Sequence, residues 1–248
     1  MQMEPFPLLE GPASSRMIGI DLGTSYTCAS YVDAEEKPQM IPMDRGRRAL
    51  PSAVCLQGDQ VFVGEAALSR LETDPGSVVH SWKRILGRSA SSGAVREAAP
   101  RVAYRIDAGA GQEATVFVGG VEFPATWFAA RVLYEVRLWA REHLSEVIRA
   151  AVIAVPAHFT EPQRNAVREA ATLAGFETVR LFAEPVAAAI AYGIPRDQQK
   201  KLLVYDFGGG TFDVTVLEQD GALFQVLSTG GDARLGGVDF DERIMGHC

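Results

Sequence analysis

The chain has 248 residues, of which 47% are hydrophobic and 22% are charged, and its formal net charge is -7. This length can bury one large core or two smaller ones, and the composition is typical of a globular protein. The acidic balance argues against nucleic acid as a partner, because neutralising phosphates requires a basic face. A membrane partner is not expected either, since no apolar run approaches the roughly 20 residues of a spanning helix.

The cysteines and the first residues indicate the cellular compartment. Cys28, Cys55 and Cys248 are too few and too scattered for a disulfide framework or a zinc site, so we expect a reducing, cytoplasmic environment. Residues 1–16 lack the basic start and the long apolar core of a signal peptide. We expect them to form a disordered tail.

The first half of the chain reads as strands followed by a long helix. From Met17, "MIGIDLGTSYTCASYVD" predicts a β-hairpin with a glycine-bearing tip, and shorter strands are expected at 53–56 and 60–63. Helical spacing of apolar residues predicts a helix within 78–88, with Gly87 as its stop. Residues 89–100 are expected to form a mobile connector, 102–123 a hairpin, and 124–144 a long helix.

The second half alternates strands and helices. Residues 150–157 read as a strand covered on both faces, and 160–174 as the clearest helix, with Thr160 and Gln163 as a capping box. A strand is expected from Val179, and a short helix from Pro185. Residues 202–221 read as two strands interrupted by glycines, followed by a strand at 223–228 and a helix that begins near Gly237.

Two stretches of the chain are similar to each other. "IGIDLGTSYT", from Ile18, and "LLVYDFGGGTFDVT", from Leu202, both run from an apolar strand through an aspartate and a glycine-bearing turn into a second strand. A duplicated unit predicts two lobes of similar design that face one another across a cleft.

Glycine turns of this kind suit the binding of phosphate. Without a Cβ, backbone N–H groups can approach an anion, and glycine also supplies the positive φ that builds anion-binding nests. Asp21 and Asp206 precede the two turns, and carboxylates beside phosphates require a cation, for which Mg²⁺ held through its waters is the usual choice. Either turn alone could be an ordinary tight turn, but the shared Asp-x-Gly pattern favours a phosphate site.

Other phosphate-binding motifs are missing or fail in their context. No G-x-x-x-x-G-K-[ST] motif is present, which excludes a P-loop protein. The residues "GAGQEA", from Gly109, imitate a dinucleotide fingerprint, but a strand-like stretch follows where a helix is required. Phosphate binding is therefore expected at the paired turns.

The longer stretches resemble the nucleotide-binding domain of the heat shock protein 70 chaperone family, within the actin, sugar-kinase and chaperone superfold. The stretches that carry this resemblance are "IGIDLGTSYTCASYVD", "RGRRALPSAV", "WKRILGR", "VIAVPAHFTEPQRNAVREAATLAGFETVRLFAEPVAAAIAYG", "LLVYDFGGGTFDVTVLE" and "GGDARLGGVDFDERI". They occur in the family's order, so the resemblance runs from Met17 to the last residue.

The resemblance implies an α/β fold, namely a duplicated actin-like ATPase fold with two ribonuclease H-like lobes around a nucleotide cleft. Residues 17–148 would form the first lobe and 149–248 part of the second. The chain stops inside a helix of the second lobe, so we expect a truncated domain without its adenosine-binding part or a peptide-binding domain. Weak nucleotide affinity and little turnover would follow for this chain alone.

The resemblance also implies which residues bind ATP or ADP and Mg²⁺. The β- and γ-phosphates would be cradled by two sets of residues: Gly23, Thr24, Ser25 and Tyr26 in the first lobe, and Gly208, Gly209, Gly210 and Thr211 in the second. Asp21 and Asp206 would orient hydrated Mg²⁺, and Asp213 would be a supporting carboxylate.

The implied catalytic residues are Lys83, Glu184, Asp206 and Thr211. Lys83 and Thr211 would hold the attacking water, and Glu184 would join the metal and water network. Pro156 and Arg164 would form an interlobe switch that reports nucleotide state. Without the resemblance, Lys83 and Arg164 would be read as solvated helix residues and Glu184 as an acid near a helix N-terminus.

Departures from the family pattern are mild. Ser25 stands where the family usually has threonine and keeps the hydroxyl, Tyr26 follows it, and Ala183 replaces a usual asparagine. The family's partners are unfolded client peptides, a J-domain co-chaperone and a nucleotide exchange factor, in protein folding and the stress response. A superfold kinase, an actin-like filament protein and a non-catalytic nucleotide-binding fragment are the alternatives.

Overall fold

The computed structural model describes residues 6–12, 14–109, 111–194 and 199–247. The contacts divide the chain into two compact units, the first comprising Met1–Ile153 and Thr160–Arg180, the second Ala154–Phe159 and Leu181–Cys248. The sequence-based division has its boundary at residue 148, whereas the contacts group Thr160–Arg180 with the first unit.

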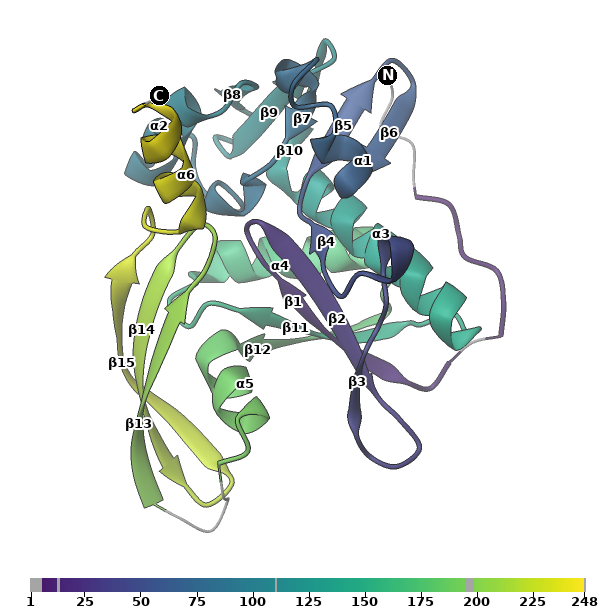
Figure 1. The fold of residues 1–248 in the computed structure, drawn as a ribbon, viewed down its shortest axis with the longest axis vertical. Coiled ribbons are helices and arrows are strands. Elements are labelled where there is room, and N and C mark those ends of the chain that lie inside the picture. Colours follow the sequence, from purple (N-terminus) through teal and green to yellow (C-terminus); the bar gives the residue numbers. More distant parts are fainter. Residues whose placement is uncertain (1–5, 13, 110, 195–198, 248) are drawn as a thin grey trace. The chain divides into compact units, whose positions relative to one another are not determined.

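The first unit is built on a mixed sheet with the strand order β12-β11-β1-β2-β3, and β4 also pairs with β2 (Figure 1). These strands are β1 (Met17–Leu22), β2 (Tyr26–Val32), β3 (Pro38–Met40), β4 (Leu50–Pro51), β11 (Ala150–Val155) and β12 (Thr178–Ala183). β1 and β2 form the hairpin that the sequence predicts, with Ile20 opposite Ala29. The last residues of β11 and β12 belong to the second unit.

Two smaller antiparallel sheets complete the strands of the first unit. One has the order β6-β5-β7 and the other β10-β9-β8. Their strands are β5 (Val54–Gln57), β6 (Gln60–Val63), β7 (Val78–Val79), β8 (Arg105–Ala108), β9 (Ala114–Val118) and β10 (Val121–Pro124). The strands predicted at 53–56 and 60–63 are thus confirmed, and the short helix α1 (Glu65–Leu68) follows Gly64.

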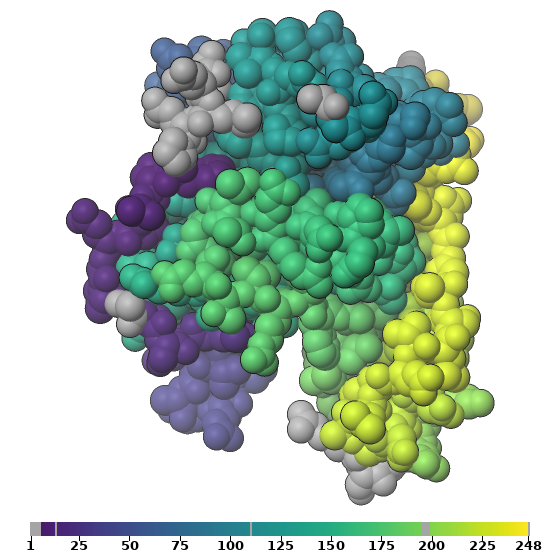
Figure 2. Space-filling model, turned by 180° about the vertical axis from the view of Figure 1, so that it is seen from behind, coloured from purple at the N-terminus to yellow at the C-terminus, as the bar shows by residue number. Residues whose placement is uncertain are grey.

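Helix α3 (Ala125–Leu144) is the central element of the first unit, because it contacts strands of all three sheets and packs against α4 (Glu161–Leu173). Its Arg137 is buried and donates from Nε to the Ile148 carbonyl oxygen at 2.7 Å. Helix α4 begins with the predicted capping box of Thr160 and Gln163. Seen from behind, the green residues of α4 lie at the surface (Figure 2).

The second unit contains an antiparallel sheet with the order β13-β14-β15 and two helices (Figure 1). These elements are α5 (Glu184–Ala191), β13 (Gln199–Phe207), β14 (Phe212–Asp220), β15 (Leu223–Asp232) and α6 (Gly237–Met245). Helix α5 covers one face of the sheet, where Val186 and Ala189 pack against Leu217. The strand–glycine–strand prediction for 202–221 is confirmed.

The helix predicted within 78–88 is wrong on both sides of a short central turn, since residues 85–87 are not helical either. Val78 and Val79 form strand β7 and pair with Cys55 and Val54, and only Trp82–Arg84 makes a 3₁₀ helix. β-branched valines suit a strand, and pairing with β5 buries both completely. The left-handed backbone of Ser81, with φ of 56°, separates the two elements.

The connector predicted at 89–100 contains a helix, α2 (Gly93–Ala98). The Ser92 side chain caps it by accepting the Val95 backbone N–H at 3.4 Å, and Val95 is buried. The hairpin predicted at 102–123 gains a third strand, since β8 pairs with β9.

The described part of the N-terminal segment makes contacts with the first unit. Pro12 accepts a backbone hydrogen bond from Val147, and Ser14 donates one to the Val147 carbonyl. The Phe6 ring stacks on that of Tyr134, with centroids 5.3 Å apart. Residues 1–5 and 13, which also belong to the predicted tail, lie outside the described residues, as does Cys248.

None of the helices in the described ranges is both long and apolar enough to cross a bilayer.

Candidate functional site

The two glycine turns close hairpins of the same register. We name Gly23–Tyr26 the first glycine turn and Gly208–Thr211 the second glycine turn. Before the first, Leu22 lies opposite Thr27 and Asp21 opposite Cys28. Before the second, Phe207 lies opposite Phe212 and Asp206 opposite Asp213. Asp21 and Asp206, both exposed, therefore hold equivalent positions relative to their turns.

The prediction that these glycines adopt positive φ is wrong. Gly23 and Gly208–Gly210 are not among the glycines with positive φ. What requires glycine at position 23 is close backbone approach, because a Cβ there would lie 2.2 Å from the Tyr26 carbonyl oxygen. The Gly208 N–H donates across its turn to the Thr211 carbonyl at 3.0 Å.

Buried Ser52, just after β4, holds the carbonyls of the first glycine turn. Its hydroxyl donates to the Gly23 carbonyl oxygen at 2.8 Å, and its backbone N–H donates to the Ser25 carbonyl oxygen, also at 2.8 Å. The carbonyls of Gly23 and Ser25 are therefore both directed toward the buried Ser52.

The start of helix α6 holds the carbonyls of the second glycine turn. The Gly237 N–H donates to the Gly208 carbonyl at 3.1 Å, and the Val238 N–H donates to the Gly209 carbonyl at 2.9 Å. Gly236 permits this contact, because a Cβ there would lie 2.5 Å from the Gly209 backbone.

These carbonyl contacts fix the direction of the neighbouring amides. In a trans peptide the C=O and the following N–H point in opposite directions, and no cis peptide is present in the described residues. The N–H groups of Thr24 and Tyr26 therefore point away from Ser52, and those of Gly209 and Gly210 point away from α6. Each turn thus presents directed amide dipoles, as an anion site requires.

Lys83 lies in the 3₁₀ helix Trp82–Arg84, directly after a fully buried Trp82. Farther along this segment, Gly87 has a φ of +63° and packs on the start of α4, where a Cβ would lie 2.6 Å from Gln163 Cα. The half-buried Arg164 is the next residue of α4. Within the first unit, the segment that follows Lys83 therefore packs against the N-terminal end of α4, where Arg164 lies.

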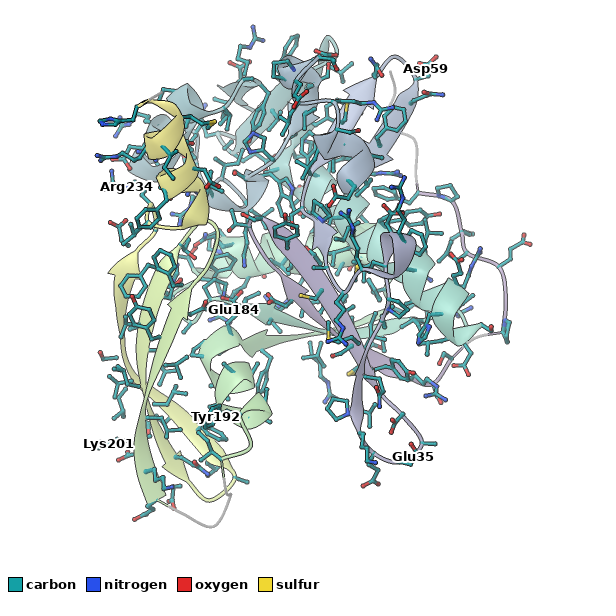
Figure 3. All side chains as sticks on the ribbon, viewed as in Figure 1. Glu35, Asp59, Glu184, Tyr192, Lys201 and Arg234 are labelled. Carbon is teal, nitrogen blue, oxygen red and sulfur yellow. The ribbon has the colours of Figure 1, made fainter. Side chains whose placement is uncertain are left out.

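The second unit brings together most of the remaining predicted residues. Figure 3 shows Glu184 at the N-terminal end of α5, and α5 packs against the sheet that carries Asp206 and Asp213. His158 Nδ1 lies 3.0 Å from Asp213 Oδ1. Pro156 is buried, and its carbonyl accepts the Phe159 N–H at 3.1 Å.

The predicted residues therefore form two groups. The first unit contains Asp21, Gly23, Thr24, Ser25, Tyr26, Lys83 and Arg164, and the second contains Pro156, Glu184, Asp206, Gly208, Gly209, Gly210, Thr211 and Asp213. Within each group the structure connects a glycine turn, its aspartate and the elements that hold them.

The donor atoms fit a hydrated magnesium ion. Carboxylates and hydroxyls are the hard oxygen ligands that Mg²⁺ prefers, and an ion that keeps several waters needs only one or two carboxylates. Within the described residues, no group of three or more His, Cys, Asp or Glu side chains is close enough to hold a metal directly. Asp21 lies on β1 opposite Cys28. Burial, and next the charge of Asp21, raise the pKa of the Cys28 thiol.

Comparison with known families decides between the members of the superfold. A family model described as Hsp70 protein matches residues 17–248. The chain belongs to the Hsp70 family. The match begins at the first residue of β1 and includes both glycine turns. Hsp70 family proteins normally bind ATP or ADP with Mg²⁺, and the mixed α/β architecture agrees with a fold of the Hsp70 ATPase type.

Three residues that hold parts of the candidate site were not predicted from the sequence. Ser52, His158 and Gly236 lie within stretches that resemble the Hsp70 family, but no local pattern singles them out. Each acts through a partner distant in sequence: Ser52 through Gly23, His158 through Asp213, and Gly236 through Gly209. Only the folded chain brings these pairs together.

Proposed function

We propose that this chain binds and hydrolyses MgATP as the nucleotide-binding part of an Hsp70-type chaperone, with two lobes of duplicated design. The observation that carries this proposal is the matched pair of glycine turns. Each follows an exposed aspartate, and each has its carbonyls held by the protein so that its amides point the other way. Directed amides stabilise the negative charge of phosphates.

In this proposal both glycine turns bind the triphosphate. The first contributes the amides of Thr24 and Tyr26, and the second contributes those of Gly209 and Gly210. Asp21 and Asp206 hold Mg²⁺ through its waters, and the ion, when bound, offsets negative charge on the phosphate oxygens.

Phosphoryl transfer to water depends mainly on positioning and charge stabilisation. Lys83 and Thr211 hold the attacking water in line, and Glu184 orders the water around the metal. Asp213, paired with His158, supports the second glycine turn from β14. We expect slow turnover, coupled to conformational change through Pro156 and Arg164.

The proposed cellular role is nucleotide-controlled binding of unfolded peptides. In the Hsp70 family, lobe closure on ATP loosens peptide binding, and hydrolysis tightens it. A J-domain co-chaperone and a nucleotide exchange factor are the corresponding partners. Measuring the binding and hydrolysis of MgATP tests the proposed site directly.

Two substitutions test the proposed chemistry. Lys83→Ala should lower single-turnover ATP hydrolysis by about 10²-fold while MgATP affinity, measured by calorimetry, stays within about threefold. Asp206→Asn should weaken nucleotide binding with Mg²⁺ but leave the weaker binding in EDTA unchanged, because its role depends on the ion.

Matched controls are exposed residues of the same types. Lys201→Ala on β13 and Asp59→Asn in the turn between β5 and β6 should leave hydrolysis and affinity unchanged (Figure 3). Wild-type protein that binds no MgATP, or a Lys83→Ala variant that hydrolyses it at the wild-type rate, would contradict the proposal.

A further inference from the structure

Every polar group of Ser52 is bonded to an element of the candidate site. In addition to its bonds to the first glycine turn, its carbonyl oxygen accepts the Trp82 indole N–H at 2.9 Å. Its Oγ lies 2.9 Å from Thr27 Oγ1 on β2. Ser52, Thr27 and Trp82 have relative exposures of 1%, 0% and 0%, so no water competes for these bonds.

The hydrogen bonds of the Ser52 hydroxyl have one possible direction. A carbonyl oxygen only accepts, so the single hydroxyl proton of Ser52 goes to Gly23. The Thr27 hydroxyl must then donate to Ser52 Oγ. This fixed direction keeps the Gly23 carbonyl turned inward, and with it the Thr24 amide turned outward.

The indole bond extends this arrangement to the Lys83 segment. Trp82 precedes Lys83 in the 3₁₀ helix, and its ring nitrogen is tied to the same serine that holds the first glycine turn. Movement of the turn therefore displaces the anchor of Lys83, because a buried indole N–H that loses its acceptor costs free energy.

We propose that Ser52 is the positioning residue of the first glycine turn, which sets the outward direction of its amides and couples them through Trp82 to Lys83. This inference rests on the proposed nucleotide function. The two hydrogen-bonding groups have separate roles. The Ser52 hydroxyl governs phosphate affinity, whereas the Trp82 indole N–H governs the placement of Lys83 and hence turnover.

The test uses Ser52→Ala, Ser52→Thr and Trp82→Phe in the full chain. Ser52→Ala should weaken MgATP binding about tenfold and reduce the MgATP-induced shifts of the Thr24 and Tyr26 amide resonances, whereas Ser52→Thr, which keeps the hydroxyl, should restore both. Trp82→Phe should lower single-turnover hydrolysis about tenfold with affinity nearly unchanged.

The controls separate positioning from general stability. Ser69→Ala removes an exposed hydroxyl that also donates to a backbone carbonyl, that of Ala66, and should change nothing. Circular dichroism and thermal unfolding establish that each variant is folded at the assay temperature. Trp82→Phe, which tests the indole bond independently, covers the case in which Ser52→Ala does not fold.

Failure of this inference differs from failure of the proposed function. If wild-type protein binds MgATP and a folded Ser52→Ala binds it equally well with unchanged amide shifts, the positioning role is wrong and the nucleotide function stands. Wild-type hydrolysis by Trp82→Phe would likewise overturn the coupling to Lys83. If wild-type protein itself does not bind MgATP, the proposed function fails and this inference fails with it.

Discussion

At the scale of single residues, burial decides the charge state of His80. Its ring is half-buried and packs edge-on to the Tyr104 ring, and the residue precedes the segment that carries Lys83. Burial, and next the charge of Arg84, lower the pKa of His80 below its ordinary value of 6.5. The folded protein therefore holds this histidine neutral at a pH where the unfolded chain takes up a proton.

This shift predicts a loss of stability in acid. Below pH 6.5 the unfolded state binds more protons at His80 than the folded state, so the free energy of unfolding falls as pH falls from 6.5 through the lower folded pKa. His80→Phe keeps an aromatic ring and should flatten this part of the stability profile, measured by urea unfolding at several pH values. The matched substitution at exposed His247 should leave the slope unchanged, and an equal slope in His80→Phe would contradict the prediction.

At the scale of elements, the approach of α6 to the second glycine turn depends on the lack of a side chain at Gly236. The backbone of Gly209 and Gly210 occupies the space that a Cβ would need, at 2.5–2.6 Å. Backbone atoms cannot move aside as the end of a flexible side chain can. The bonds from Gly237 and Val238 to the turn therefore require glycine at this position.

Gly236→Ala should displace α6 from the second glycine turn. We expect the free energy of unfolding, measured by urea denaturation, to fall by about 1–3 kcal/mol, the usual cost of forced overpacking. Gly230→Ala on β15 is the control, since a Cβ there meets nothing within 4 Å, and it should change stability by no more than about 0.5 kcal/mol. Equal stability of the two variants would show that α6 does not depend on this contact.

At the scale of the whole molecule, the sheet of the second unit has apolar side chains on both faces. Leu202 and Val204 face the core that α5 covers. Leu203 and Tyr205 alternate with them on β13 and are 68% and 66% exposed, and Phe240 on α6 is 52% exposed. An apolar surface of this kind favours association.

Adding charge to the sheet face that carries Leu203 and Tyr205 should reduce self-association of the protein. The double variant Leu203→Lys/Tyr205→Lys should bind less of a fluorescent apolar dye and scatter less light at high protein concentration than wild type. The control Val32→Lys/Met40→Lys adds the same charge at exposed apolar residues of the first unit and should have a smaller effect. Equal reductions would mean that net charge, and not this face, controls association.

The candidate site was predictable wherever its residues form a local pattern. Asp21 with Gly23, and Asp206 with Gly208, stand in short stretches whose strand–turn–strand pattern specifies both hairpins and their register. The means by which the turns direct their amides was not predictable. The sequence predicted positive φ at the glycines. Instead, hydrogen bonds from Ser52 and from the start of α6 to the turn carbonyls set the direction of the amides. Both anchors lie far from their turns in sequence.

The sequence by itself determined the hairpins, the long helix α3 and the capped helix α4, because hydrophobic periodicity, turn glycines and caps act between near neighbours in the chain. Only the tertiary structure decided that Val78 and Val79 form a strand, that Ser52 ties Gly23 to Trp82, and that Gly236 admits α6 to the second turn. These features depend on partners distant in sequence, whose energies outweigh local preference and arise only when folding brings the partners into contact.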